Sequence, residues 1–193
     1  MSEGGRLLTL GGALLAFACG SAPPRYDAAA LTNAHLSPAL SQWLVGPIAR
    51  MAAAEEIAAF LDLRGDAAAE RFIAAFWQRR DPEPRSAENE ARELFEARVV
   101  EADRRFSEAG VRGRRTDRGA ILVLYGEPSE SRFEISRLER DPPLEVWSYD
   151  ADAAAGLDGE RPEATYRFFK PDDLTILYRR LPPRRLPAPG PDG

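Results

Sequence analysis

The chain has 193 residues, of which 44% are hydrophobic and three are tryptophan, so it can bury a core and fits one compact domain. Acidic residues outnumber basic residues by 31 to 26, which gives a formal net charge of −5. Binding to nucleic acid draws on an excess of positive charge, so this balance predicts no nucleic acid partner.

The first 18 residues have the pattern of an export signal. Arg6 precedes an apolar stretch from Leu7 to Ala18, and Cys19 follows that stretch. A helix needs about 20 apolar residues to cross a bilayer, so this shorter stretch favours a cleaved signal peptide over a permanent span. Cys19 and the residues before it resemble the lipobox of bacterial lipoproteins, whose cysteine is acylated. We therefore expect a membrane anchor at Cys19, with a plain secretory signal as the alternative.

Proline marks the two ends of the mature chain. Residues 19–38 contain three prolines and are predicted to be a tether between the lipid and the folded domain. Residues 181–193 contain five prolines and are predicted to be a disordered tail. The globular domain is accordingly expected over residues 39–180.

Three helices are predicted in the first half of this domain. The first runs from Gly46 to Leu61 with Gly65 as its cap, and the second follows Asp66 until the prolines at 82 and 84. Ser86 is expected to open the third helix, over about residues 87–109.

The second half has the short apolar pattern of strands. Ala120 to Tyr125 is apolar throughout and predicts a central strand covered by helices. Further strands are predicted at 144–149, 165–170 and 174–179, with a short one at 133–136. The turn residues between the last two main strands predict an antiparallel hairpin. Helices followed by strands predict an α+β fold, with about three helices packed on a mainly antiparallel sheet of four to five strands.

Most catalytic classes lack the residues they need. The single histidine, His35, falls in the predicted tether, and the single cysteine is the predicted lipid site, so neither a cysteine nor a serine nucleophile has a histidine partner. The same shortage excludes histidine and cysteine metal sites, and no cofactor motif is present. We expect no catalytic residues, metal or cofactor.

Carboxylate chemistry is the alternative that the residues leave open. Asp117 and Glu127 would stand at opposite ends of the predicted central strand, about 20 to 30 Å apart, and so would not act together. Asp81, Glu127 and Glu145 would need to meet across the fold to serve as the acid and base of a glycosidase-like hydrolase.

Several polar residues have structural interpretations that we favour. Thr116 and Asp117 can bond to the backbone of a turn, where Gly119 can take a positive φ. A buried polar network that ties the helix junction to the sheet is predicted for four residues, Arg80, Asp81, Asn89 and Arg98.

A contact surface is the other prediction from the residues. Trp77 is assigned to the core, whereas Trp147 and Tyr149 alternate along one strand and predict a partly exposed aromatic face. Such a face would suit protein or glycan contact if it lay beside the nearby arginines, namely Arg112, Arg114, Arg115 and Arg118.

Several segments together resemble the bacterial GWxTD domain. They are the FIAAFWQRRDPEP string from Phe72, the stretch from Gly113 to Gly119, the YGEP turn from Tyr125 and the EVWSY block from Glu145. The naming motif here reads Gly113, Arg114, Arg115, Thr116, Asp117, with Arg114 in place of the family's tryptophan. Members of the family look like exported proteins, often lipoproteins, and the resemblance implies no activity.

These observations predict a membrane-tethered, exported protein of the bacterial cell envelope. Its single domain is expected to bind an envelope protein or glycan without catalysis, with Arg114 as the first residue to test. A carboxylate-dependent hydrolase acting on envelope glycan is the alternative.

Overall fold

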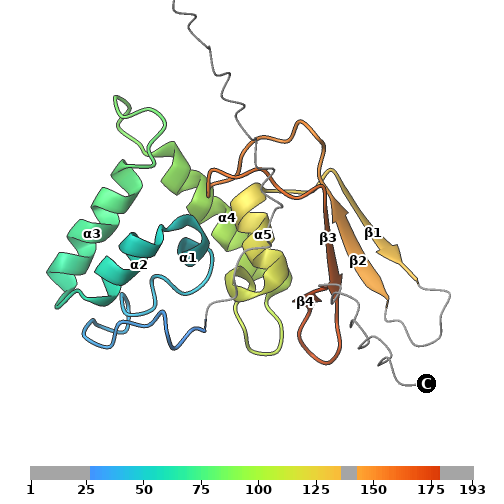
Figure 1. Ribbon diagram of the computed structural model, residues 1–193, viewed down its shortest axis with the longest axis horizontal. Coiled ribbons are helices and arrows are strands. Elements are labelled where there is room, and N and C mark those ends of the chain that lie inside the picture. Colours follow the sequence, from blue (N-terminus) through green and yellow to red (C-terminus); the bar gives the residue numbers. More distant parts are fainter. Residues whose placement is uncertain (1–26, 136–142, 179–193) are drawn as a thin grey trace, which may run out of the picture.

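A computed structural model describes residues 27–135 and 143–178 and shows an α+β fold, as predicted. Its described residues form five α-helices and one four-stranded antiparallel sheet. Helices α4 and α5 lie between the sheet on one side and helices α1 to α3 on the other (Figure 1). Within the described segments, no helix combines the length and apolar character that a membrane crossing needs. The predicted signal peptide, Cys19 and the tail from 181 lie outside the described residues.

The helix expected from Gly46 to Leu61 is two helices in the structure. These are α1 (Ile48–Met51) and α2 (Ala54–Leu61), and the two residues between them have extended backbone. Ala53, the second of these, donates its N–H to the Glu56 carboxylate at 3.0 Å. This bond satisfies an amide at the start of α2 and favours a new helix there over continuation of the first.

The next two helices follow the prediction except at one boundary. Helix α3 (Asp66–Gln78) ends before the prolines, and α4 (Glu90–Phe106) begins later than the expected start after Ser86. The N-cap of α4 is Asn89, whose Oδ1 accepts the N–H of Arg92 at 2.9 Å. Asparagine at this position stabilises a helix start by satisfying an N–H that has no partner in the helix.

The predicted central strand from Ala120 to Tyr125 is wrong, because this segment belongs to helix α5 (Asp117–Tyr125). Thr116 is the N-cap of the helix, and its hydroxyl accepts the N–H of Gly119 at 3.1 Å. Gly126 ends the helix with a φ of 80°, a value that favours glycine.

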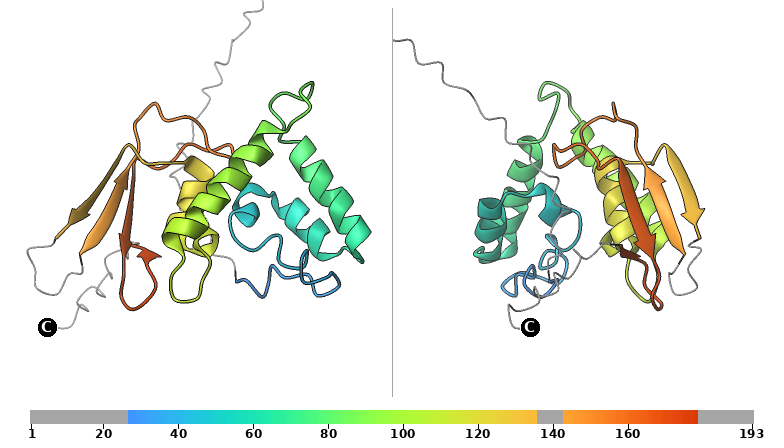
Figure 2. Two further views of the ribbon diagram at one scale, coloured as in Figure 1. Left: turned by 180° about the vertical axis from the view of Figure 1, so that it is seen from behind. Right: turned by 45° about the vertical axis from the view of Figure 1, so that its right-hand side comes forward.

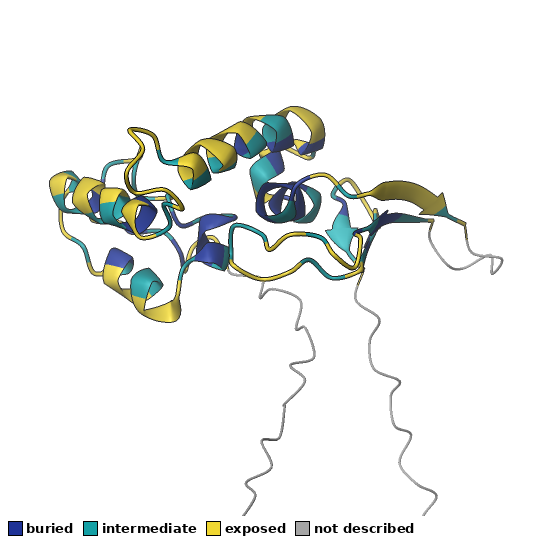
Figure 3. Ribbon diagram, turned by 90° about the horizontal axis from the view of Figure 1, so that it is seen from above, coloured by how far each residue is buried: buried dark blue, intermediate teal, exposed yellow. Residues whose placement is uncertain are grey.

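The burial of α5 explains the error. Every residue from Gly119 to Leu124 is buried, and α5 lies in the middle of the molecule when it is coloured by exposure (Figure 3). A helix covered on all sides needs no polar face, so its sequence lacks the 3.6-residue alternation that marks an amphipathic helix. A short apolar run of this kind has the same appearance as a buried strand.

The sheet is an antiparallel meander with the strand order β1-β2-β3-β4. Its strands are β1 (Glu130–Glu134), β2 (Leu144–Ser148), β3 (Thr165–Phe169) and β4 (Ile176–Leu177). The predicted hairpin is confirmed, because Phe169 pairs with Ile176 and Phe168 with Leu177 across β3 and β4. Helices α4 and α5 cover one face of the sheet (Figure 2).

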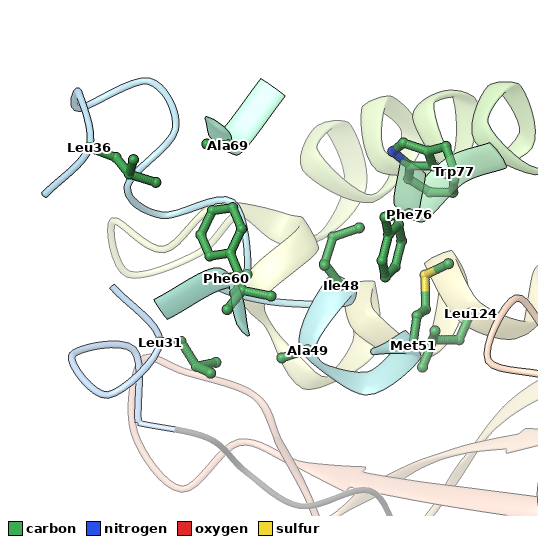
Figure 4. Packing of buried hydrophobic residues seen from close by; sticks show 11 residues of the cluster. Leu31, Leu36, Ile48, Ala49, Met51, Phe60, Ala69, Phe76, Trp77 and Leu124 are labelled. Atoms are coloured by element: carbon green, nitrogen blue, oxygen red, sulfur yellow. The ribbon is translucent and has the colours of Figure 1, made fainter. Parts of the chain in front are cut away.

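Two hydrophobic clusters lie on opposite sides of α5. Leu124 packs with residues of α1 to α3, including Phe60, Phe76 and Trp77 (Figure 4). Residues Ile121 to Val123 of the same helix pack with aromatic residues of the sheet, including Trp147 and Phe168. Helix α5 therefore supplies side chains to both cores.

The folded part begins earlier than the predicted boundary at residue 39. Leu31 and Leu36 are buried in the core, and Asn33 is 2% exposed. The Asn33 side-chain amide donates to the backbone carbonyl of Phe60 at 2.8 Å and to that of Leu63 at 3.1 Å. Residues 31–36 are thus held by the C-terminal end of α2, which the prolines nearby in the sequence did not indicate.

Candidate functional site

The described residues enclose a cleft with a volume of about 960 Å³. Its walls come mainly from three parts of the chain that are distant in sequence: the segment 28–50, the loop 110–117 and residues 174–176. Phe95 of α4 and Ala120 of α5 complete the lining. Ligand sites in proteins typically occupy about 300 to 1,000 Å³, so the cleft has the size of a binding site.

Positive charge dominates this cleft. Four arginines line it (Arg50, Arg112, Arg114 and Arg115), whereas its one lining carboxylate is Asp117. This excess of arginine stands out in a chain whose formal net charge is −5. The cleft therefore favours a ligand that carries negative charge.

Two of these arginines are paired with carboxylates. Arg114 donates from Nε and from its backbone N–H to Asp103 of α4, at 2.9 and 2.8 Å. Arg50 lies 3.7 Å from the Asp117 carboxylate. Asp103 and Asp117 thus offset part of the positive charge, and the Asp103 contact fixes Arg114 against α4.

The other two arginines lack such a partner. Within residues 27–135 and 143–178, Arg112 forms no ion pair, and Arg115 donates to the neutral amide oxygen of Gln42 at 2.9 Å. Burial lowers the pKa of Arg115, and the positive charges of Arg112 and Arg114 lower it further, against a smaller opposing effect of the Asp103 carboxylate. Arginine stays protonated despite this lowering of its pKa. The positive charges of Arg112, Arg114 and Arg115 therefore still repel one another in the folded protein.

Thr116 and Asp117 hold the loop to its neighbours. Thr116 is 2% exposed and donates its hydroxyl to the Gly113 carbonyl at 2.8 Å. The Asp117 carboxylate accepts the N–H of Leu177 in β4 at 2.7 Å. These bonds join the loop 110–117, helix α5 and the sheet, so they position the arginines of the cleft.

Two glycines allow three backbones to pack directly. A Cβ on Gly113 would overlap the carbonyl of Ala102 in α4, and a Cβ on Gly119 would overlap the carbonyl of Gly113. The expected positive φ at Gly119 is wrong, since the described positive-φ glycines do not include it. What the position requires is the absence of a side chain. The two glycines are visible in the sequence, six residues apart. The sequence does not show which backbone segments they contact.

The four residues expected to form one polar network at the helix junction are instead satisfied separately. Asp81 accepts the N–H of Glu83 within its own turn at 3.0 Å. Asn89 caps α4 and donates to the carbonyl of Trp77 at 2.8 Å. Arg98 donates to the carbonyls of Val123 and Leu124, described below. The prediction of one connected network is therefore wrong, because these residues face different elements.

Arg80 is held by a carboxylate that sequence reasoning missed. Its guanidinium donates to the two oxygens of Glu56 at 2.6 and 3.2 Å and lies 3.6 Å from the ring centroid of Phe76. Arg79 donates to the same carboxylate at 2.7 Å. Hydrogen bonds from Arg80, and then from Arg79, lower the pKa of Glu56 to about 2 against the partial burial that raises it. Glu56 lies 24 residues before Arg80, so no local pattern linked them.

Arg98 belongs to α4, and its side chain lies against the C-terminal end of α5. Its Nη1 donates to the carbonyls of Val123 and Leu124 at 3.2 and 3.1 Å. These carbonyls belong to the last turn of the helix, where no N–H within the helix reaches them. Burial lowers the pKa of Arg98. The side chain thus serves as a helix cap.

The predicted exposed aromatic face is also wrong. Trp147 is 1% exposed and Tyr149 is 7% exposed, because α4 and α5 cover that side of the strand. The ring of Trp147 packs 5.5 Å from that of Phe106 in α4. Tyr149 donates its hydroxyl to the Gly126 carbonyl at 2.8 Å, and burial raises its pKa.

Arg118 is tied to the sheet. It donates to Glu145 at 2.9 Å and to Glu108 at 3.2 Å. Glu145 also accepts the indole N–H of Trp147 at 2.8 Å, and Glu108 accepts the N–H of Thr175 at 2.9 Å. These contacts link α5 to β2 and to the chain before β4, so Arg118 belongs to the scaffold of the domain and does not line the cleft.

The candidate carboxylates for hydrolysis fall in separate surroundings. Glu127 is exposed and bonds to Arg105, Glu145 is bound by Arg118 and Trp147, and Asp81 lies in the turn after α3. None of the three lines the cleft. Helix α5 is about 12 Å long from Asp117 to Tyr125, shorter than the predicted strand, and Glu127 follows two residues after its end. Within the described ranges, no three residues among histidine, cysteine and the acids are grouped to hold a metal ion.

Comparison with known proteins gives one match. A family model described as the GWxTD domain matches residues 27–171. Neither the curated proteins nor the solved structures contain a match. The matched range begins at Asp27, where the described residues also begin, and includes the segment 28–50 and the loop 110–117 that line the cleft.

Proposed function

This chain belongs to the GWxTD domain family, and we propose that it is a non-catalytic binding protein of the bacterial cell envelope that holds its partner in the arginine-lined cleft. The observation that carries the proposal is the pair Arg112 and Arg115. Protein carboxylates offset the charge of Arg50 and Arg114, whereas no described carboxylate pairs with these two.

The geometry of the cleft supports binding over catalysis. Thr116 and Asp117 are occupied by backbone N–H groups, and neither is placed as a nucleophile beside a base. The alternative of a carboxylate-dependent hydrolase gains no support here, because Asp81, Glu127 and Glu145 each have separate partners and none lines the cleft.

Export and tethering are the second part of the proposal. The support is the N-terminal pattern, in which Arg6, the apolar stretch from Leu7 and Cys19 follow one another as in a lipoprotein signal. Several acyl chains on Cys19 would anchor the protein stably, since each buried methylene contributes about 0.8 kcal/mol.

Site-specific photo-crosslinking in bacteria tests the binding role. A photo-reactive residue replaces Ala39, which is exposed and lines the cleft, and in a matched strain it replaces Ala74, which is exposed on α3. We expect a discrete envelope adduct from position 39 and none from position 74. Equal labelling at the two positions, or no adduct at position 39, would contradict the proposal.

Fatty-acid labelling tests the anchor separately. Cys19→Ser should abolish incorporation of labelled palmitate and release the protein from the membrane fraction. Ser21→Ala, two residues later, is the control and should change neither result. Persistent labelling of the Cys19→Ser chain would show that the anchor lies elsewhere.

A further inference from the structure

We propose that the cleft binds a phosphate ester, with Arg112 and Arg115 as the residues that hold its phosphate group. This inference rests on the proposed binding function and names the chemical class of the ligand. Both arginines line the same wall of the cleft, on the loop 110–117, and neither is paired with a described carboxylate.

The charge of the loop favours an anion with more than one acceptor oxygen. Arg112, Arg114 and Arg115 lie within four residues, and the repulsion among them adds to the burial that lowers the pKa of Arg115. Asp103 bonds directly to Arg114 and attracts Arg112 and Arg115 only from farther away. A bound anion in direct contact with Arg112 and Arg115 would offset the remaining repulsion, so the folded loop gains stability from the ligand itself.

Phosphate suits two guanidinium groups better than carboxylate does. Each guanidinium offers a planar fork of N–H donors, and bidentate binding uses two acceptor oxygens for each fork. A carboxylate has two oxygens and one charge, whereas the phosphate of a monoester has three unesterified oxygens and a charge between about −1.5 and −2 at neutral pH. The second arginine would therefore increase the affinity for a phosphate much more than the affinity for a carboxylate.

The remaining lining indicates what the phosphate is attached to. Trp43, Ile48 and Ile176 give the cleft an apolar wall, and its volume of about 960 Å³ exceeds what a phosphate ion alone would fill. An ester with an apolar organic group would use both surfaces. The headgroup of phosphatidic acid and a soluble phosphate monoester share this chemistry.

The positions of the two ends of the described chain favour a lipid as the source of the phosphate. Ala28 and Ile176, near the two ends of the described chain, both line the cleft. Cys19 lies eight residues before Asp27, a separation that can span at most about 26 to 29 Å. An acyl anchor at Cys19 would thus keep the cleft within reach of lipid headgroups.

Titration of the full chain in detergent with glycerol 3-phosphate tests the phosphate site, with glycerol as the uncharged control. We expect saturable binding that weakens at least tenfold in Arg112→Gln/Arg115→Gln. The matched control is Arg71→Gln/Arg85→Gln, which removes the same charge from two exposed arginines outside the cleft and should bind as the unchanged chain does. Arg112→Lys/Arg115→Lys keeps the charge but loses the forks, and should weaken binding by an intermediate factor.

A second arm identifies the source of the phosphate. Sedimentation with vesicles of phosphatidic acid, whose headgroup is a phosphate monoester, is compared with phosphatidylcholine vesicles for the unchanged chain and the Arg112→Gln/Arg115→Gln chain. The apolar N-terminal stretch is identical in both chains, so a difference between them reports the arginines. A preference for phosphatidic acid that the double variant loses supports a headgroup ligand. Binding of glycerol 3-phosphate without that preference supports a soluble ester.

The proposal is overturned if glycerol 3-phosphate shows no saturable binding, or if the control double variant loses binding as much as the cleft variant does. The proposed binding function can survive that result. An adduct at position 39 together with no phosphate binding would retain the cleft as a binding site and reject phosphate as its ligand.

Discussion

Arginines serve opposite purposes at the helix junction and in the cleft. At the junction, Arg80 is bound by Glu56, and Arg98 is bound by two carbonyls at the end of α5. In the cleft, Arg112 and Arg115 lack any described carboxylate partner. The comparison teaches that the abundance of arginine in this chain says little by itself. What separates a structural arginine from a binding arginine is whether the protein already supplies its acceptors.

Removing the support of the cleft loop should have the largest effect. Gly119→Ala would drive a methyl group into the Gly113 carbonyl, and the overlap is with backbone that cannot rotate away. We expect a loss of about 3 kcal/mol or more in the free energy of unfolding, measured by urea denaturation.

Gly159→Ala provides the matched control for that change. Gly159 has a φ of 81° but open space where a Cβ would lie, so its substitution should cost only the backbone strain, about 1 kcal/mol. Similar losses for the two variants would show that close packing at Gly119 is unimportant.

Removing a structural arginine should have the next largest effect. Arg98→Met keeps much of the side-chain volume but leaves the Val123 carbonyl without this donor, whereas the Leu124 carbonyl keeps the N–H of Leu157 at 3.0 Å. We expect a loss of about 2 to 3 kcal/mol in the free energy of unfolding. Arg92→Met is the control, because Arg92 is exposed on α4, the helix that also carries Arg98. It should lower the free energy of unfolding by less than about 0.5 kcal/mol. An equally small loss for Arg98→Met would contradict the distinction between the structural arginines of the helix junction and the arginines of the cleft.

Acid should weaken the helix junction through Glu56. Its pKa is about 2 in the folded protein and 4.5 in the unfolded reference, so the folded state favours the ionised form. The resulting stabilisation is fully present above about pH 4.5 and is lost as the pH falls toward 2. We expect Glu56→Gln to be less stable than the unchanged chain by about 1 to 3 kcal/mol at pH 6, with the gap closing by pH 2. A gap that is independent of pH would assign the loss to packing.

The cleft arginines should have the smallest effect on stability. Arg112→Gln/Arg115→Gln removes two charges that repel each other, one exposed hydrogen bond to Gln42 and the longer-range attraction of Asp103, so these opposing effects should change the free energy of unfolding by less than about 0.5 kcal/mol. Thermal unfolding measures this directly. A loss comparable to that of Arg98→Met would mean that Arg112 and Arg115 are structural after all.

The sequence predicted those parts of the fold whose signals are local. Proline placed the end of α3, the Pro171 turn predicted the β3 and β4 hairpin, and the order of helices and strands predicted α+β. The sequence of helix α5 resembles that of a strand because burial on all sides removes the pattern by which a helix is recognised. The burial of Trp147 is hidden for a related reason, since alternation along a strand does not reveal which face the helices cover.

The candidate site was predictable only in part. Arg112, Arg114 and Arg115 were identified as candidate contact residues, but beside an aromatic face that is buried. The cleft itself depends on the meeting of three segments separated by more than 50 residues, and no periodicity or spacing encodes such a meeting. The pairing of Arg114 with Asp103 likewise required the structure, because it decides which arginines have a partner and which do not.

The burial of α5 has a consequence for how the domain comes apart. Leu124 belongs to the helical core, and Ile121 to Val123 belong to the core against the sheet. If either core unfolded, one side of α5 would lose the side chains that pack against it. Unfolding of one core would therefore destabilise the other. The domain should therefore melt as a single cooperative unit, and the amides of α5 should be among its slowest to exchange with solvent.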